Sequence, residues 1–165
     1  MFAQSEKSDA LTNRQKRWNR FWRYAPLVAW MLFIFSASTS LLSGNNTSRF
    51  VRPFLLWLFP HISEDRIYLV HFTTRKIAHF TEYAIFGFLA ARAFYGSTHD
   101  WLRRRWFTFA AALIILYSLS DEFHQSFVPS RGASIYDSMI DTAGGLTALL
   151  LFAFWQRRKR DRVAV

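Results

Sequence analysis

The sequence predicts an all-α membrane protein with four transmembrane helices and short interfacial helices in the first extracytoplasmic loop. Three observations lead to this prediction. The 165 residues are 52% hydrophobic and 19% aromatic. The apolar residues gather in long blocks that approach the roughly 20 residues a transmembrane helix needs. Lys and Arg residues lie at the flanks of these blocks, where membrane proteins carry their orientation signals.

Composition also excludes several classes of function. The chain has no cysteine, which excludes disulfides and thiolate metal sites. A net charge of +10 could indicate a nucleic-acid partner. Because the basic residues flank the apolar blocks, we instead read them as orientation signals and expect the lipid bilayer, not nucleic acid, as the partner.

The N-terminal part of the sequence predicts a basic segment followed by a first transmembrane helix. Residues 1–23 are polar and basic, and we expect them to form an amphipathic segment in the cytoplasm. The uncharged block 24–42 predicts the first spanning helix, with Pro26 in its first turn, where a missing N–H costs little. A cleaved signal sequence is the alternative. However, the block exceeds the roughly 7–15 apolar residues of a signal peptide and has no obvious cleavage site.

The first extracytoplasmic loop predicts two short helices. A Gly-Asn-Asn turn is expected at residues 43–46. Residues 49–59 are apolar but too short to span, which indicates an interfacial or re-entrant helix that Pro60 ends. Residues 63–74 begin with Ser-Glu-Asp, a pattern typical of a helix N-cap with an acidic first turn.

Three further spans are expected, and together with the first they make residues 24–156 one membrane domain. The predicted segments are a second helix at 75–95, a basic loop at 96–105, a third helix at 106–127, a Pro-Ser-Arg-Gly turn at 129–132, a fourth helix at 135–156 and a basic cytoplasmic tail at 157–165.

The distribution of charge predicts the orientation. Four spans place both termini on one side, and that side carries fifteen of the 21 Lys and Arg residues. Positive residues favour the cytoplasm, so both termini are predicted to be cytoplasmic. The polar stretch 120–145 then lies at the extracytoplasmic end. Three spans plus a re-entrant pair at 120–141 is the alternative.

This polar stretch holds four carboxylates at membrane depth. The uncharged runs 106–120 and 142–156 have fifteen residues each, so helices of about 20 residues must extend into the stretch between them. The extension brings four acids into or to the edge of the membrane, where carboxylates are typically paired or functional. They are Asp121, Glu122, Asp137 and Asp141.

Helical spacing indicates which polar residues face one another. Asp137 and Asp141 share a face with the small-residue pair Gly144 and Ala148, which predicts that both acids point into the bundle. Asp121 and Gln125 share a face of the third helix, with Glu122 beside them. Lys76, His79 and Tyr83 share a face of the second helix.

The sequence also contains residues typical of two other kinds of site, a metal site and a hydrolase triad. His79-x-x-Glu82 and Asp121-x-x-His124 have spacings that can build a metal site. Because such spacings are common and Lys76 and Arg131 would repel a dication, we predict no metal and no cofactor. A Ser-His-Asp hydrolase is not supported, because the sequence has no Gly-x-Ser-x-Gly motif around a nucleophilic serine. The remaining histidines, His61, His71 and His99, are read as surface residues.

The sequence contains two motifs of polar, aromatic and proline residues at fixed spacing, Lys76-x-x-His79-Phe80-x-x-Tyr83 and Asp121-Glu122-x-x-Gln125-x-Phe127-x-Pro129-x-Arg131-x5-Asp137. These motifs resemble the VanZ-like family of bacterial membrane proteins, named for an accessory determinant of teicoplanin resistance. The resemblance covers residues from about 33 to 151 and implies a bacterial inner membrane. The chain departs at Asp141, where the family usually has asparagine, at Ala148, where glycine is common, and at 38–40, where many members have Ser-Ser-Gln.

The leading functional expectation is a site for an anionic envelope molecule, such as a lipid-linked phosphate or a cell-wall precursor. Lys76 and Arg131 would hold the anionic group. Asp121, Glu122, Asp137 and His79 are the candidates for proton transfer, although the pattern leaves open whether a reaction occurs. The expected ligand-binding set is Lys76, His79, Tyr83, Asp121, Glu122, Gln125, Arg131, Asp137 and Asp141.

The alternative is an accessory protein whose polar network only stabilises the bundle. In that case, the acids would pair with Arg75, Lys76, Arg131 and His79. Either way, Asp137 and Asp141 lie four residues apart on one face, and their repulsion needs relief. We expect either a cation between them or one acid that stays protonated. A protonated Asp141 would replace the family's asparagine as a hydrogen-bond donor.

Overall fold

The computed structural model describes residues 2–39, 44–128 and 133–163. Over these residues the chain is all-helical, as predicted, and contains no strand. Its helices are α1 (Phe2–Ala37), α2 (Gly44–Leu58), α3 (Glu64–Tyr95), α4 (Asp100–Arg104), α5 (Trp106–Gln125) and α6 (Ile135–Val163).

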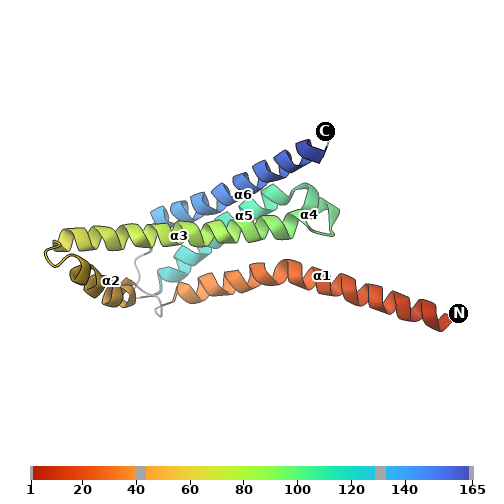
Figure 1. Cartoon of the computed structure of the whole chain (residues 1–165), viewed down its shortest axis with the longest axis horizontal. Coiled ribbons are helices and arrows are strands. Elements are labelled where there is room, and N and C mark those ends of the chain that lie inside the picture. The colour runs from red at the N-terminus through yellow and green to blue at the C-terminus, as the bar shows by residue number, and fades with distance from the viewer. Residues whose placement is uncertain (1, 40–43, 129–132, 164–165) are drawn as a thin grey trace.

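The long helices form an elongated bundle (Figure 1). α3 packs against α6, α5 and α1, and the α3–α6 pair is the most extensive. Both termini and α4 lie at one end of the bundle, and α2 lies at the opposite end (Figure 1). The polar ends of α3, α5 and α6 therefore meet at the end away from the termini.

The core combines large and small side chains. Tyr83, Phe86 and Ile114 are fully buried among alanines of α3 and α5. Glycines bring α3 and α6 into backbone contact: a Cβ atom at Gly87 would clash with the backbone of α6, and one at Gly144 with the backbone of α3. These contacts fix the separation of the two helices that carry most of the polar site.

α1 packs Leu27 and Ile34 into the core and also takes part in hydrogen bonds from aromatic side chains. Trp30 Nε1 donates to the carbonyl of Glu82 at 3.0 Å, and the Tyr117 hydroxyl donates to the carbonyl of Met31 at 2.6 Å. Between α2 and α3, Arg52 Nη2 lies 2.5 Å from Glu64 Oε1. The hydrogen bond to Glu64 raises the pKa of this exposed guanidinium. Side-chain contacts thus hold both α1 and α2 in place relative to the rest of the bundle.

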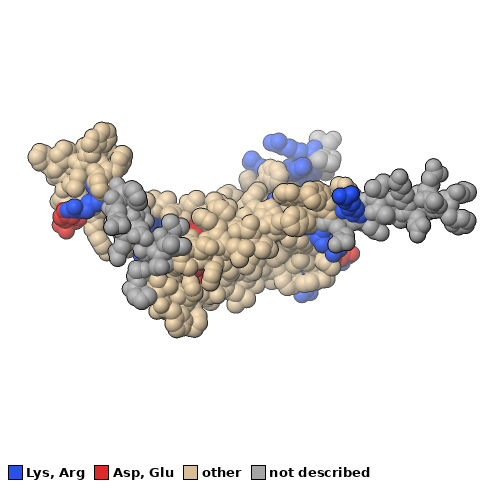
Figure 2. All heavy atoms as spheres, turned by 90° about the horizontal axis from the view of Figure 1, so that it is seen from below, with Lys and Arg blue, Asp and Glu red and all other residues tan. Residues whose placement is uncertain are grey.

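The surface suits contact with lipid. Large apolar side chains point outward along the bundle, including Leu116, Leu151 and Ile77, each more than 60% exposed. The middle of the face seen in Figure 2 carries few charged residues, whereas the ends carry most of the visible Lys and Arg. An apolar belt between charged ends is what a bilayer selects.

Among the described residues, two helices are long and apolar enough to cross a membrane: Trp106–Gln125 and Ile135–Arg162. The prediction of four spanning helices is thus supported for α5 and α6. α1 and α3 do not meet the same criterion. In α1 the uncharged part of the helix covers only residues 24–37 and follows Arg20 and Arg23, and α3 carries charges in its first half.

Several predicted boundaries are wrong. Residues 63–74 and 75–95 form one helix, α3, because no Gly or Pro separates them. Ser63 is its N-cap, without a side-chain capping hydrogen bond. Likewise, α1 begins at Phe2, so Pro26 lies inside a helix and not in a first turn. Good helix formers such as Ala, Leu, Lys and Arg precede this proline.

Other differences are smaller. Gly44, Asn45 and Asn46 belong to α2 and not to a turn. The basic loop contains the short helix α4. α6 continues through the basic tail to Val163, since its Arg and Lys residues favour helix. The predicted turn at 129–132 lies outside the described residues.

Candidate functional site

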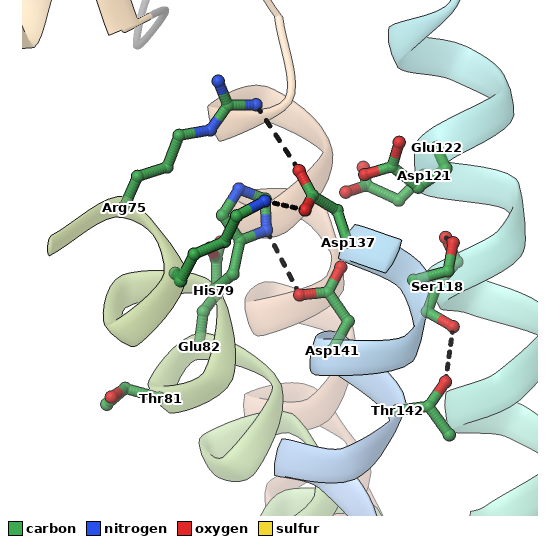
Figure 3. Close-up of polar contacts among 12 residues, drawn as sticks. Arg75, His79, Thr81, Glu82, Ser118, Asp121, Glu122, Asp137, Asp141 and Thr142 are labelled. Carbon is green, nitrogen blue, oxygen red and sulfur yellow. Dashed lines mark hydrogen bonds and ion pairs between the residues drawn. The ribbon is translucent and has the colours of Figure 1, made fainter. Parts of the chain in front are cut away.

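A cluster of buried polar side chains occupies the end of the bundle opposite the termini. The first half of α3, the last two turns of α5 and the first two turns of α6 supply it (Figure 3). The acids are almost fully buried, with Asp141 at 0% exposure and Asp137 at 2%. Also buried are His79, Tyr83, Ser118, Asp121, Glu122, Gln125 and Ser138.

Each of the two buried aspartates of α6 has its own basic partner on α3. Lys76 Nζ pairs with Asp137 Oδ1, and Arg75 Nη2 lies 3.9 Å from Asp137 Oδ2 (Figure 3). One turn deeper, His79 Nδ1 is 3.1 Å from Asp141 Oδ1. The expected repulsion between the two acids is therefore relieved by separate partners, and among the described residues no single cation contacts both of them.

The acids of α5 make contacts of a different kind. Glu122 Oε2 accepts from the backbone N–H of Ser134 at 2.7 Å, just before the first turn of α6, where a negative charge is favourable. Asp121 Oδ2 accepts from Gln125 Nε2 at 3.0 Å within α5. Glu122 thus stabilises the start of α6, whereas Asp121 has no partner on another helix among the described residues.

Hydroxyl groups complete the joint between α5 and α6. The Ser118 and Thr142 hydroxyl oxygens are 3.0 Å apart, and Ser138 Oγ donates to the carbonyl of Ser118 at 3.2 Å. These bonds lie beside the ion pairs (Figure 3). Together they hold the acids of α6 in fixed positions relative to α5.

A cavity of about 230 Å³ opens between α1, α2, α3 and α5, next to the cluster. Phe33 and Ile34 of α1 give it an apolar side. The opposite side is polar and comprises His71, Arg75, His79, Glu82, Asp121 and Gln125. The cavity is thus amphipathic, with its polar groups on α3 and α5.

Three polar atoms of this wall are buried without a hydrogen-bond partner in the described part of the chain. They are His71 Nε2, Arg75 Nη2 and Gln125 Oε1. The guanidinium of Arg75 has a carboxylate only at 3.9 Å, beyond hydrogen-bonding distance. Because buried polar groups are nearly always satisfied, these atoms have hydrogen-bonding capacity left for a polar group in the cavity.

The cavity divides the predicted site residues. His79, Asp121 and Gln125 line it. Four others lie outside its wall and form the contacts that join α3 and α5 to α6: Lys76, Glu122, Asp137 and Asp141. Tyr83 is fully buried, with its ring 5.9 Å from that of Phe86. The last predicted residue, Arg131, lies outside the described residues.

The two pairs considered as metal ligands do not converge. His124 faces α1, where its Nδ1 is 3.4 Å from Ser38 Oγ and its ring is 4.7 Å from that of Phe35. His79 faces Asp141 instead. Across the described residues, no three His, Asp or Glu side chains are grouped so that they could hold a metal ion.

Sequence reasoning missed two residues of the cavity. His71 was read as a surface residue, but its imidazole lines the cavity and Nε2 is buried. Arg75 was read only as a counter-ion. The signal was present in the spacing, because His71, Arg75 and His79 follow one another at four-residue intervals and so share a face of α3.

Comparison with known protein families identifies a match over most of the chain. The family model described as VanZ/LLP1 matches residues 21–156, which include all the residues named above for the cluster and the cavity. No curated protein and no solved structure matches the chain.

Proposed function

The chain belongs to the VanZ/LLP1 family, and we propose that it binds the anionic head group of a lipid-linked envelope molecule in the cavity beside Arg75. In this proposal, α1, α3, α5 and α6 all cross the bacterial inner membrane. Both termini are cytoplasmic, and the cavity opens at the extracytoplasmic end. A lipid-linked phosphate or a cell-wall precursor is the proposed class of ligand.

The observation that supports this proposal is the buried Arg75 Nη2, which makes no hydrogen bond in the described part of the chain and lines an amphipathic cavity. A guanidinium presents a planar fork that fits phosphate or carboxylate oxygens. His71 Nε2 lies in the same wall and provides a second position for a hydrogen bond. Phe33 and Ile34 would contact the lipid part of the ligand.

This assignment changes the proposed roles of the two basic neighbours on α3. Lys76 is paired with Asp137, so its contribution is to hold α6 in place. Arg75 takes the anion-binding role, and Arg131 remains a proposed second contact. Of the proposed catalytic candidates, His79 and Asp121 reach the cavity, and they are the pair best placed to move a proton there. A link to teicoplanin-type resistance, as the VanZ-like resemblance implies, is part of the proposal.

A purely structural role is the second candidate. It is favoured by the ties between helices, in which Lys76 contacts Asp137 and His79 contacts Asp141. Such buried pairs specify how helices dock even when they add little net stability. This alternative gives no role to the cavity atoms that lack a hydrogen-bond partner in the described residues.

The test is binding of polyprenyl phosphate to the full chain purified in mild detergent, measured by mass spectrometry of the retained lipid. Removing one charge-assisted hydrogen bond of about 1.5–3 kcal/mol should weaken binding on the order of ten- to a hundredfold in Arg75→Gln. The matched control is Arg66→Gln, which removes the same charge from the exposed surface of α3. Polyprenol without phosphate should bind neither protein.

The two candidates give opposite results. Under the binding hypothesis, Arg75→Gln unfolds at the same temperature as the control but loses the lipid, whereas Lys76→Met unfolds at a lower temperature. If Arg75→Gln retains polyprenyl phosphate as well as Arg66→Gln does, the cavity is not the binding site. The structural role is then the better account.

A further inference from the structure

A second cavity lies at the other end of the bundle, between the end of α3, the start of α5 and the last part of α6. Its volume is about 470 Å³. Trp106 and Phe107 of α5 form one wall, and Leu150 and Phe154 of α6 form the other. Leu150 and Phe154 are also exposed at the bundle surface, so this groove is open to the lipid around it.

The groove becomes basic toward the C-terminal end of α6. Arg157 and Arg160 line it one turn apart on the same helix face as Leu150 and Phe154. Neither guanidinium forms an ion pair with a carboxylate of the described chain. The neighbouring cations behave differently, since Arg158 lies 4.7 Å from the Phe154 ring centroid and Lys159 lies 5.6 Å from that of Trp155.

We propose that this groove binds one anionic phospholipid of the leaflet on the side of the termini. Its acyl chains would lie along the aromatic wall, and its phosphate would sit between Arg157 and Arg160. Leu150 and Arg157 are separated by about 10 Å along the helix, at about 1.5 Å per residue, which suits an amphiphile crossing from tail to head group. Basic pockets between transmembrane helices bind anionic lipid head groups in this way.

Charge selects the class of lipid. A zwitterionic phospholipid brings an ammonium group to a surface that already carries Arg157, Arg160 and the other cations of the α6 tail. That ammonium would be repelled, whereas the net negative charge of phosphatidylglycerol would be attracted. A soluble anion would use the arginines but would leave the aromatic wall unused. The combination of both surfaces in one groove therefore favours an anionic phospholipid.

The experiment compares thermal unfolding of the full chain in detergent with added phosphatidylglycerol, phosphatidylcholine or glycerol phosphate. We expect phosphatidylglycerol alone to raise the unfolding temperature of the wild type. The double variant Arg157→Gln/Arg160→Gln should lose this rise while keeping the unfolding temperature measured without lipid. The matched control, Lys159→Gln/Arg162→Gln, removes two charges from the same turns of α6 but outside the groove, and should respond as the wild type does.

Two outcomes would overturn the proposal. If both double variants lose the effect equally, the lipid is attracted by the charge of the tail and not by the groove. If glycerol phosphate stabilises the wild type as much as phosphatidylglycerol does, the arginines bind a free anion and the aromatic wall has no role. Neither outcome bears on the cavity beside Arg75, which lies at the other end of the bundle.

Discussion

Asp137 and Asp141 lie one turn apart on α6 but are in different electrostatic situations. Asp137 faces two cations on α3: it pairs with Lys76, and Arg75 lies 3.9 Å away. Asp141 faces a single imidazole, that of His79 at 3.1 Å, and its other oxygen is buried without a hydrogen-bond partner in the described residues. Negative charge is therefore needed more at Asp137 than at Asp141.

The first prediction at the residue scale concerns neutral substitution of these two acids. An asparagine at 141 can still accept from His79 Nδ1–H, so Asp141→Asn should change stability by less than about 1 kcal/mol. Asp137→Asn leaves the Lys76 ammonium without its carboxylate, and breaking a buried pair costs up to about 3–5 kcal/mol. Lys76 is 21% exposed, which places the expected loss toward the lower value. Denaturation in detergent measures both.

The same comparison tests the interpretation of Asp141 as a substitute for the family's asparagine. Equal damage from the two substitutions, or greater damage from Asp141→Asn, would show that both acids work as anions. His79→Gln provides a control, because it removes the imidazole to which either an aspartate or an asparagine at position 141 would be hydrogen-bonded. With His79→Gln in place, exchange of Asp141 for asparagine should have no further effect.

The site could be predicted from sequence only in part. Helical spacing indicated that the acids point inward, and all four are buried. Spacing could not choose between the two polar faces of α3 that meet at His79, one with Lys76 and Tyr83 and the other with His71 and Arg75. That choice depends on where α1 and α2 pack against α3, which is a tertiary contact. The cavity, and the Arg75 nitrogen that makes no hydrogen bond in the described residues, therefore became visible only in the structure.

At the scale of the elements, the α3–α6 contact depends on glycine. A Cβ at Gly144 would overlap the carbonyl oxygen of Phe80, and the opposing atom belongs to the backbone of α3, which cannot rotate away. The clash would push apart the two helices that carry the Lys76–Asp137 and His79–Asp141 contacts. Small residues at such crossings allow the close packing that holds membrane helices together.

We therefore predict that Gly144→Ala destabilises the protein by about 1–3 kcal/mol, the usual cost of overpacking. Helix propensity alone predicts the opposite sign, since alanine in place of glycine favours a helix by roughly 1 kcal/mol. The unfolding temperature in detergent decides between the two signs. Ala143→Leu is the control, because it adds more atoms one position away on the exposed side of α6 and should be tolerated.

The elements themselves were predictable to different degrees. α5 and α6 begin at the predicted residues, since charged or turn residues precede their apolar runs. The division of α3 into two helices was wrong because it rested on the expected depth of the membrane and not on a helix-breaking residue. Membrane depth limits where apolar residues lie, but it does not end a helix. For the same reason, α1 and α6 continue as helices beyond their apolar parts.

For the whole molecule, the bundle separates two chemically different ends. One end holds the termini, α4 and the groove with Arg157 and Arg160, and the other holds α2 and the buried acids (Figure 1). α1, α3, α5 and α6 each run between these ends. If all four cross the bilayer, both termini must face the same compartment, and the excess of Lys and Arg at that end predicts the cytoplasm.

This topology is tested by fusing green fluorescent protein, which matures in the bacterial cytoplasm but not after export in unfolded form, to three positions. Fusions after Thr98, between α3 and α4, and at the C-terminus should fluoresce, whereas a fusion after Ile62, between α2 and α3, should not. A dark C-terminal fusion beside a fluorescent Thr98 fusion would mean that an odd number of segments crosses after α4. The arrangement with three spans and a re-entrant pair at 120–141 would then replace four spans. A fluorescent Ile62 fusion would instead show that α1 does not cross, because residues 1–62 would then remain on the cytoplasmic side.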